Sequence, residues 1–374
     1  MKAGYSVKRI KDICDKGSSN VAQKDLEGHN GEYPIYGASG LIKNVDFFHQ
    51  DREYVGIVKD GSGIGRVAFY PPKSSLIGTL QYIFPKAEYD IRYVGYCLQS
   101  LDLASYRQGA AIPHIYFRDY GEREVLVADN IKEQQRIVDI LDREFAKIDA
   151  LKANAEKSLQ AAKDLFASIQ TSVLENRNWK RYTLNDVCLL ITDGTHRTPK
   201  YQDSGVPFLS VKNITGGFID MTDTRFISEA EHQELIKRCK PEYNDILYSK
   251  VGTTGVAKVI DIYDEFSIFV SLALLKVRQD IVKSSMLEKI LNAPYVRKQA
   301  KKLTRGTANK NFVITDIKSV ILYIPELADQ EQIESIMDLY AEKVSAIQEN
   351  YQKTLTLCDD LKQSLLRKAF NGEL

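Results

Sequence analysis

Two long segments of the chain place apolar residues at alternating spacings of three and four. In the first segment these positions are Ile137, Leu141, Ile148, Leu151, Ala155, Ala162, Leu165 and Ile169. In the second they are Ile333, Met337, Tyr340, Val344, Ile347, Tyr351, Cys358, Leu361 and Leu365. This spacing is typical of helices that bury one narrow apolar seam. Glu144, Ser158 and Ser172 interrupt the first seam, which favours two helices packed on each other; the alternative is that each packs on its own domain.

The segments outside these two helices have strand-like patterns. Two apolar runs in residues 53–70 flank a glycine-rich turn at residues 60–65. Two similar runs in residues 245–260 flank a turn at residues 251–255. Apolar and β-branched runs joined by a short glycine-rich turn predict paired antiparallel strands. A helical stretch, a glycine and a last strand follow in both segments, so we expect two domains of mixed α and β structure.

The chain also repeats itself. Gln134 and Gln330 occupy matching places in two similar segments that lie 196 positions apart. A second pair of similar segments ends at Cys14 and Cys188, which are 174 positions apart. Two independent matches favour an internal duplication. Chance similarity between two coiled-coil segments is the alternative explanation of the first match.

We therefore predict an α+β fold in which two mixed α/β domains alternate with two long helices. The domains cover residues 1–130 and 179–327, and the spacer helices cover residues 131–178 and 328–374. If a pseudo-twofold axis relates the two halves, the helices form an antiparallel coiled coil that holds the domains at opposite ends. At ~1.5 Å per residue, a helix of about 46 residues spans roughly 69 Å.

Composition narrows the class of protein. Hydrophobic residues make up 44% of the chain, and 51 basic residues nearly balance 50 acidic ones. The five cysteines form no C-x-x-C pair and the five histidines have no metal-binding spacing, which argues against a disulfide framework or a zinc site. No apolar run is long enough to span a bilayer, and the N-terminus has no signal-peptide pattern. We expect a cytoplasmic protein without a membrane partner.

The distribution of charge along the chain is more informative than its net charge. Residues 179–327 carry 22 basic and 17 acidic groups, whereas residues 1–130 carry 16 of each. Residues 297–310 hold six basic residues and no acidic one. A basic stretch that continues into Gly, Thr and Asn suits contact with phosphates and base edges. A solvated helix face explains the same stretch equally well. Residues 106–114 are a weaker counterpart in the first domain.

Motifs for catalysis are weak. The glycines at residues 61–65 lack the full G-x-G-x-x-G spacing and precede a strand rather than a helix, so they are better explained as turn residues. The sequence N-A-P-Y at residues 292–295 departs from the N-P-P-Y motif of adenine methyltransferases at Ala293, and Pro294 is better explained as a helix break. No P-loop sequence occurs. We therefore predict no catalytic residue, no metal and no cofactor in this chain.

Several motifs in combination resemble the specificity subunit of type I restriction–modification systems. In the second domain they are D-G-T-H-R-T-P-K-Y from Asp193, G-V-P-F-L-S-V-K-N-I from Gly205, D-I-L-Y-S-K-V-G-T-T-G from Asp245 and Y-I-P-E-L-A-D-Q-E-Q-I from Tyr323. The tail S-L-L-R-K-A-F-N-G-E-L from Ser364 is similar to the family's C-terminal ending. The first domain fits through Y-P-I-Y-G-A-S-G from Tyr33, but it has no D-G-T-H block.

This resemblance implies a protein that is not itself an enzyme. Each domain would be a target-recognition domain that reads one half of a split sequence in double-stranded DNA. The paired helices would set the gap between the half-sites and dock two modification (methyltransferase) subunits. Those subunits would bind S-adenosylmethionine and methylate adenine, and restriction subunits would add translocation and cleavage that use ATP and magnesium.

We expect loops of both domains to contact DNA. Lys and Arg would mainly contact phosphates, while Gln, Asn, Thr and His could reach base edges. The candidates in the first domain are Lys59, Ser62, Arg66, Arg107, Gln108 and His114. In the second domain they are Thr195, His196, Lys212, Asn213, Lys250, Thr253, Thr254, Arg305, Thr307, Asn309 and Lys310. The alternatives are a methyltransferase or nuclease fragment with its own activity, and a coiled-coil scaffold without a DNA role.

Overall fold

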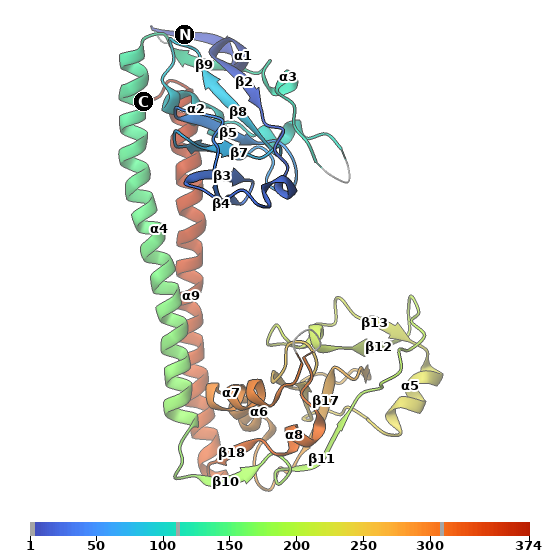
Figure 1. Cartoon of the computed structure of the whole chain (residues 1–374). Coiled ribbons are helices and arrows are strands. Elements are labelled where there is room, and N and C mark those ends of the chain that lie inside the picture. Colours follow the sequence, from blue (N-terminus) through green and yellow to red (C-terminus); the bar gives the residue numbers. More distant parts are fainter. Residues whose placement is uncertain (1–3, 110–112, 307–309) are drawn as a thin grey trace. The chain divides into compact units, whose positions relative to one another are not determined.

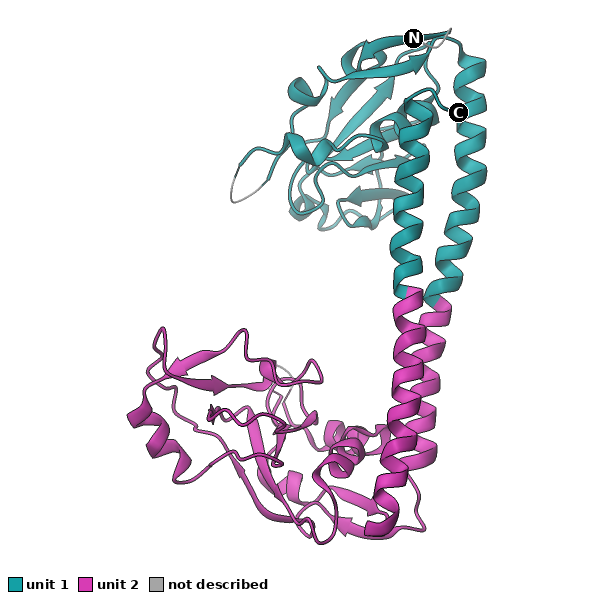
Figure 2. Cartoon of the chain, turned by 180° about the vertical axis from the view of Figure 1, so that it is seen from behind, with its two compact units in different colours: residues 1–156, 352–374 teal, residues 157–351 magenta. Residues whose placement is uncertain are grey.

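A computed structural model describes the chain except for residues 1–3, 110–112 and 307–309. The chain divides into two compact units, which Figure 2 distinguishes by colour. Unit 1 consists of residues 1–156 and 352–374, and unit 2 consists of residues 157–351. Each unit contains one sheet-rich domain and parts of two long helices, α4 (Ile131–Leu174) and α9 (Leu327–Phe370) (Figure 1).

The domain of unit 1 combines small sheets with short helices. Its strands are β1 (Tyr5–Arg9), β2 (Cys14–Ser18), β3 (Tyr33–Gly37), β4 (Gly40–Val45), β5 (Tyr54–Val58), β6 (Val67–Tyr70), β7 (Ser75–Leu76), β8 (Leu80–Pro85) and β9 (Glu124–Ala128). Its helices are α1 (Ile10–Ile13), η1 (Gln23–Leu26), α2 (Ile91–Gln99), η2 (Leu103–Tyr106) and α3 (Phe117–Tyr120), where η marks a 3₁₀ turn. The sheets have the orders β2-β8-β5-β6, β4-β3-β7 and β1-β9.

The domain of unit 2 is built in the same way. Its strands are β10 (Lys180–Thr183), β11 (Cys188–Asp193), β12 (Val206–Leu209), β13 (Arg225–Ile227), β14 (Ile246–Ser249), β15 (Ala257–Val259), β16 (Ser267–Ile268), β17 (Leu272–Val277) and β18 (Ile321–Ile324). Its helices are η3 (Val211–Asn213), α5 (Glu229–Ile236), α6 (Ser284–Asn292), α7 (Pro294–Leu303) and α8 (Ile314–Lys318). The sheets have the orders β11-β17-β14-β15, β13-β12-β16 and β10-β18.

The two domains therefore share one topology, strand for strand, which confirms the predicted repeat. The predicted strand pairs are also confirmed: β5 pairs antiparallel with β6, and β14 pairs antiparallel with β15. The predicted helix break is present as well, because α6 ends at Asn292 and Pro294 is the first residue of α7. Proline suits this position, where its missing N–H would have had no helical partner.

Helices α4 and α9 pack on each other and run antiparallel. In unit 1, Lys152 pairs with Asp359 at 2.7 Å, and Asp149, one turn earlier on α4, pairs with Lys362, one turn later on α9. In unit 2, Ile169 of α4 and Met337 of α9 belong to one apolar cluster. Separate packing of each helix on its own domain is therefore excluded. Over the described residues, no helix is both long enough and apolar enough to cross a bilayer.

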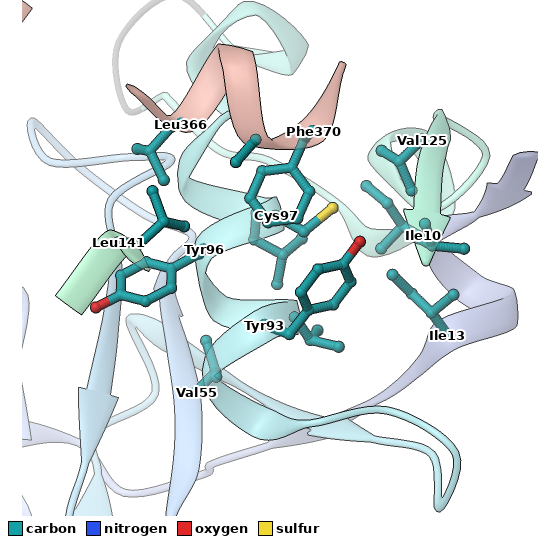
Figure 3. Close-up of a cluster of buried hydrophobic side chains, with 14 of the residues drawn as sticks. Ile10, Ile13, Val55, Tyr93, Tyr96, Cys97, Val125, Leu141, Leu366 and Phe370 are labelled. Carbon is teal, nitrogen blue, oxygen red and sulfur yellow. The ribbon is translucent and has the colours of Figure 1, made fainter. Parts of the chain in front are cut away.

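The core of unit 1 joins both helices to the domain, as Figure 3 shows. Tyr93, Tyr96 and Cys97 point from one face of α2 into a cluster that also contains Leu141 of α4. The end of α9 closes this cluster, because the ring of Phe370 lies 5.1 Å from the ring of Tyr93. The apolar face of α2 is thus covered by two segments that are far apart in the sequence.

The predicted seam is partly wrong in detail. Five of its members are exposed: Leu151 and Leu165 on α4, and Tyr340, Ile347 and Leu361 on α9. Phe145, which the seam omitted, is buried instead, with its ring 5.4 Å from that of Tyr96. A helix that packs on both a domain and a second helix buries a wider stripe near the domain than a simple two-helix seam predicts. Farther along each spacer helix, where the second helix is its main partner, part of the apolar stripe stays exposed to solvent.

One glutamine fixes each spacer helix to its own domain. Gln134 accepts a hydrogen bond from the backbone N–H of Asp90 at 2.8 Å and donates to the carbonyl of Ala128 at 3.0 Å. Gln330 makes the equivalent bonds in unit 2, accepting from the N–H of Lys283 at 2.8 Å and donating to two carbonyls. Both side chains are buried. The repeated pair found in the sequence is therefore a repeated structural joint.

Candidate nucleic-acid interface

Two loops of unit 1 are joined by backbone hydrogen bonds. The first loop is the turn between β5 and β6, and the second is the segment that follows η2. The N–H of Ile115 donates to the carbonyl of Lys59 at 2.9 Å. Gln108 and His114 close the second loop with two mutual bonds of 2.8 and 2.9 Å. These bonds bring together five of the six candidates predicted in the first domain, Lys59, Ser62, Arg66, Gln108 and His114, whereas Arg107 lies just before the closing pair.

Unit 2 repeats this arrangement in equivalent loops. The N–H of Phe312 donates to the carbonyl of Lys250 at 2.7 Å. Arg305 and Asn311 close the second loop with two mutual backbone bonds of 2.9 Å. Gly252, in the turn between β14 and β15, donates to the carbonyl of Lys310 at 3.1 Å. The predicted candidates from both loops therefore share one edge of the domain here too, except that Thr307 and Asn309 lie outside the described residues.

The side chains on the two loop pairs differ. In unit 1, His114 pairs through Nδ1 with Asp60, and Gln108 donates to Asp119 at 2.8 Å. In unit 2, the positions of Gln108 and His114 are taken by Arg305 and Asn311, and Arg305 pairs with Asp316 at 2.9 Å. One backbone frame thus presents two different sets of polar groups.

The candidates differ in exposure and in their contacts within the protein. Ser62, Arg66, Arg107, Thr253 and Lys310 are exposed, and Lys59 is half-buried. Two candidates are tied to the protein: Arg66 donates to the carbonyl of Ala38 at 2.9 Å, and Thr254 bonds the hydroxyl of Thr304 at 2.8 Å. Lys212, on η3, pairs with Asp223 at 2.8 Å.

The D-G-T-H block is anchored by a buried carboxylate. Asp193, at the end of β11, accepts hydrogen bonds from Lys250 at 2.8 Å and from His196 at 3.0 Å. Burial raises the pKa of the Asp193 carboxyl, but the bonds and positive charges of Lys250 and His196 outweigh burial, so the pKa lies below its usual value. Asp193 holds the block in place, while Thr195 is half-buried and His196 is exposed.

Two of the predicted DNA contacts need correction, because their side chains face the interior. Lys250 is 4% exposed and is bonded to Asp193. Asn213 is 2% exposed and bonds the backbone of Ser210 and of Asp220. A motif in the sequence does not distinguish a lysine whose buried side chain supports a loop from one whose side chain points into solvent. Neither side chain is therefore placed to contact DNA.

The sequence reasoning also missed some groups. Arg225 lies over the ring of Tyr201, 4.4 Å from its centre, and both are exposed beside the D-G-T-H block.

The basic stretch at residues 297–310 is divided in its exposure, because Lys298, Lys301 and Lys302 are exposed on α7 whereas Arg297 is half-buried. Burial lowers the pKa of Arg297, whose Nη1 has no hydrogen-bond partner among the described residues. The side chain of Arg297 therefore does not share one solvated face with Lys298, Lys301 and Lys302.

Comparison with known proteins follows the same division of the chain. The family model for the type I restriction modification DNA specificity domain matches residues 2–161 and again residues 176–357. The chain belongs to this family. The two matches coincide with the repeat seen in the topology, one for each domain with the larger part of the spacer helix that follows it.

Two curated specificity-family proteins are similar to the chain. It is 22% identical to the type I restriction enzyme EcoKI specificity subunit of Escherichia coli (strain K12) over 268 residues, which cover 65% of this chain and 56% of that protein. It is 24% identical to the EcoBI specificity subunit of Escherichia coli over 271 residues, covering 65% and 57%. The chain thus matches little more than half the length of these relatives.

Two solved structures share the fold of the specificity family. One is a structure that describes the structural basis of complex assembly and conformational transition of the type I R-M system. It gives a TM-score of 0.74 at 16% identity, and the alignment covers 100% of this chain and 99% of that chain. The HsdS subunit from Thermoanaerobacter tengcongensis gives a TM-score of 0.53 at 16% identity, covering 100% and 98%. At this identity, the likeness concerns the fold.

Proposed function

We propose that this chain is a sequence-specific DNA-recognition subunit of a type I restriction–modification enzyme, in which each domain reads one half of a bipartite site. One observation carries the proposal: both domains close the same two loops with the same backbone bonds, yet the side chains at equivalent positions differ, as Gln108 and His114 differ from Arg305 and Asn311. A shared frame with different polar groups suits two readers of different half-sites.

The candidate groups divide into two roles. Lys and Arg side chains supply phosphate contacts, which position the protein without reading sequence. Polar side chains that reach base edges supply the sequence preference. The proposed phosphate contacts are Lys59, Arg66, Arg107, Lys212, Arg305 and Lys310. The proposed base readers are Ser62, Gln108, His114, Thr195, His196, Thr253, Thr254, Thr307 and Asn309.

The helices supply the docking surface for two modification subunits. Large apolar side chains are exposed on both of them, including Leu357 and Leu361 on α9 within unit 1 and Leu339 and Ile347 on α9 within unit 2. Residues 357 and 361 are four apart, so they lie on one helix face. Exposed apolar stripes on a soluble protein mark protein contacts. Asp359, which lies between Leu357 and Leu361 in the sequence of α9, pairs with Lys152 of α4 in unit 1.

In this proposal the chain has no catalytic role. The modification subunits supply S-adenosylmethionine-dependent adenine methylation, and restriction subunits supply the steps that use ATP and magnesium. The specificity subunit contributes the choice of DNA site and the distance between its halves.

The decisive experiment compares the chain alone with the chain bound to its modification subunits. We expect the isolated chain to bind DNA weakly with a steep dependence on salt, and the complex to bind one bipartite sequence and methylate it in cells. Exchange of the loops at residues 108–114 for those of a relative should change one half-site only. Nanomolar specific binding by the isolated chain at physiological salt would contradict the proposal. So would methyltransferase or nuclease activity of the chain alone, which would identify an enzyme fragment.

A further inference from the structure

A small pocket of unit 2 is lined by none of the predicted DNA-contact residues. It has a volume of about 170 Å³ and lies between α5, the loop that follows it, and the segment that joins β15 to β16. Its apolar lining comes from Ile236, Pro241, Ile260, Ile262 and Phe266. Its polar lining comes from His232, Lys240, Glu242, Tyr243, Tyr263, Asp264 and Glu265.

A buried imidazole in this pocket has a nitrogen without a partner. His232 is 2% exposed, and its Nδ1 lies 2.9 Å from the hydroxyl of Ser267. Its Nε2 has no hydrogen-bond partner among the described residues. The nearest charged group is the carboxylate of Glu265, whose Oε2 lies 3.8 Å from Nε2, too far for a direct hydrogen bond. Buried polar atoms are normally bonded, so this nitrogen points to a ligand.

Two aromatic rings stand beside the pocket in contact with solvent. Tyr243 and Tyr263 stack with ring centres 4.5 Å apart and planes 4° from parallel. Tyr263 is 83% exposed, more than any other large apolar or aromatic side chain among the described residues. A flat ring held in the open in this way offers a face to a planar group.

The rim of the pocket is acidic. Glu242 is already paired with Lys240 and Lys276. No basic Lys or Arg side chain forms an ion pair with Asp264 or Glu265 within the described part of the chain, and both stand beside the tyrosines. Unneutralised carboxylates repel phosphate, so this surface does not suit DNA. They attract a cation, and the tyrosine face distinguishes a planar cation from a compact one.

We propose that this pocket binds the guanidinium of an arginine side chain from a partner protein. With a proton on Nδ1, which faces the Ser267 hydroxyl, the imidazole of His232 offers Nε2 as an acceptor. Two N–H groups of one guanidinium can then donate to Nε2 and to the Glu265 carboxylate, which are 3.8 Å apart. The guanidinium plane lies on Tyr263, and the aliphatic stem covers the isoleucines. This inference does not depend on DNA recognition and adds a protein contact on the domain itself.

The intact chain, labelled with ¹³C at the Ile δ1 methyl groups, tests the proposal by NMR titration with N-acetyl-arginine amide. We expect saturable shifts of Ile236, Ile260 and Ile262, with Ile35 of unit 1 unchanged. N-acetyl-citrulline amide has the same shape without the charge, and it should bind at least about ten-fold more weakly, because charge-assisted hydrogen bonds are lost.

Two exposed residues give variants that should leave the fold intact. Glu265→Gln and Tyr263→Ala should each weaken binding of the arginine probe several-fold, whereas Asp280→Asn, a carboxylate of unit 2 outside the pocket, should not. Equal binding of arginine and citrulline probes would overturn the proposal. The absence of saturable shifts at the three isoleucines, or equal losses in Glu265→Gln and Asp280→Asn, would overturn it as well.

Discussion

The ammonium of Lys250 lies 2.8 Å from the carboxylate of Asp193, and both side chains are buried. This pair links the end of β14 to the end of β11, which are not adjacent strands in their sheet. It therefore ties the D-G-T-H block to the turn between β14 and β15. In unit 1, Lys59 is the equivalent of Lys250, since its carbonyl accepts from Ile115 as that of Lys250 accepts from Phe312. Lys59 is half-buried, however, and β2, the equivalent of β11, ends in Ser18 rather than in an aspartate.

The buried pair predicts a large stability difference. We expect Lys250→Met to lower the free energy of unfolding by about 3–5 kcal/mol, because it leaves the Asp193 carboxylate without its main partner. Lys212→Met, which removes an exposed partner of Asp223, should cost less than about 1 kcal/mol. Urea unfolding of both variants measures the difference, and similar losses in the two would contradict a special role for Lys250.

The same pair predicts a dependence on acid. The pKa of Asp193 in the folded protein is below its ordinary value of 3.8. The stabilisation it provides is therefore complete above that ordinary value and is lost as pH falls through the lower folded value. We expect the gap in unfolding free energy between wild type and Asp193→Asn to stay constant from about pH 7 to pH 5 and to narrow below about pH 4. A gap that is unchanged at pH 3 would show that the carboxylate is not preferentially charged in the folded state.

The glutamine joints should matter more than their neighbours on the same helices. Gln134→Ala leaves the Asp90 N–H and the Ala128 carbonyl without the amide, and we expect a loss of roughly 1–3 kcal/mol in the free energy of unfolding. Gln135 is exposed, so Gln135→Ala is a matched control that should change stability by less than about 0.5 kcal/mol. The same comparison applies to Gln330 and the exposed Gln332. Equal losses of stability in the two variants of either pair would show that the buried glutamine does not fix its helix to the domain.

Basic side chains near the second loop pair should affect affinity without changing the preferred sequence. We expect Lys302→Ala or Arg305→Ala, assayed in the complex with modification subunits, to weaken binding to all DNA sequences and to reduce the slope of log K against log salt by about 1. Lys283→Ala, beside α9 where it pairs with Glu331, should leave both quantities unchanged. A changed half-site preference would instead show that the altered residue reads bases.

The open apolar stripe predicts a defect in assembly alone. Leu361 is 48% exposed on α9, so Leu361→Lys should leave thermal stability unchanged and weaken binding of a modification subunit about ten-fold or more, as expected for a buried interface position. Leu41, which is 60% exposed on β4, provides a control of equal chemistry away from the helices. Undiminished assembly of the Leu361→Lys variant, measured by analytical ultracentrifugation, would exclude this part of α9 from the interface.

The sequence by itself determined the repeat, the two long helices and the strand pairs around each glycine-rich turn. These features depend on local periodicity, turn residues and matched segments, and each of these can be read from the order of residues alone. The match of Gln134 with Gln330 is visible in the sequence, whereas the hydrogen bonds of the two side chains are visible only in the structure. The helix break at Pro294 also followed from the residue alone, since proline cannot continue a helix from within.

Only the tertiary structure decided which side chains face outward. Lys250 and Asn213 belong to two of the motifs that marked the second domain, yet both are buried. Lys250 is bonded to Asp193, and Asn213 is bonded to the backbone around η3. The heptad spacing predicts that Leu151 is buried and omits Phe145. In the structure Leu151 is exposed and Phe145 is buried, because α4 packs on a domain as well as on α9. The unpartnered Nε2 of His232 had no sequence signal at all. Spacing along the chain records the period of a helix or strand, whereas burial and ion pairing depend on segments that meet only after folding.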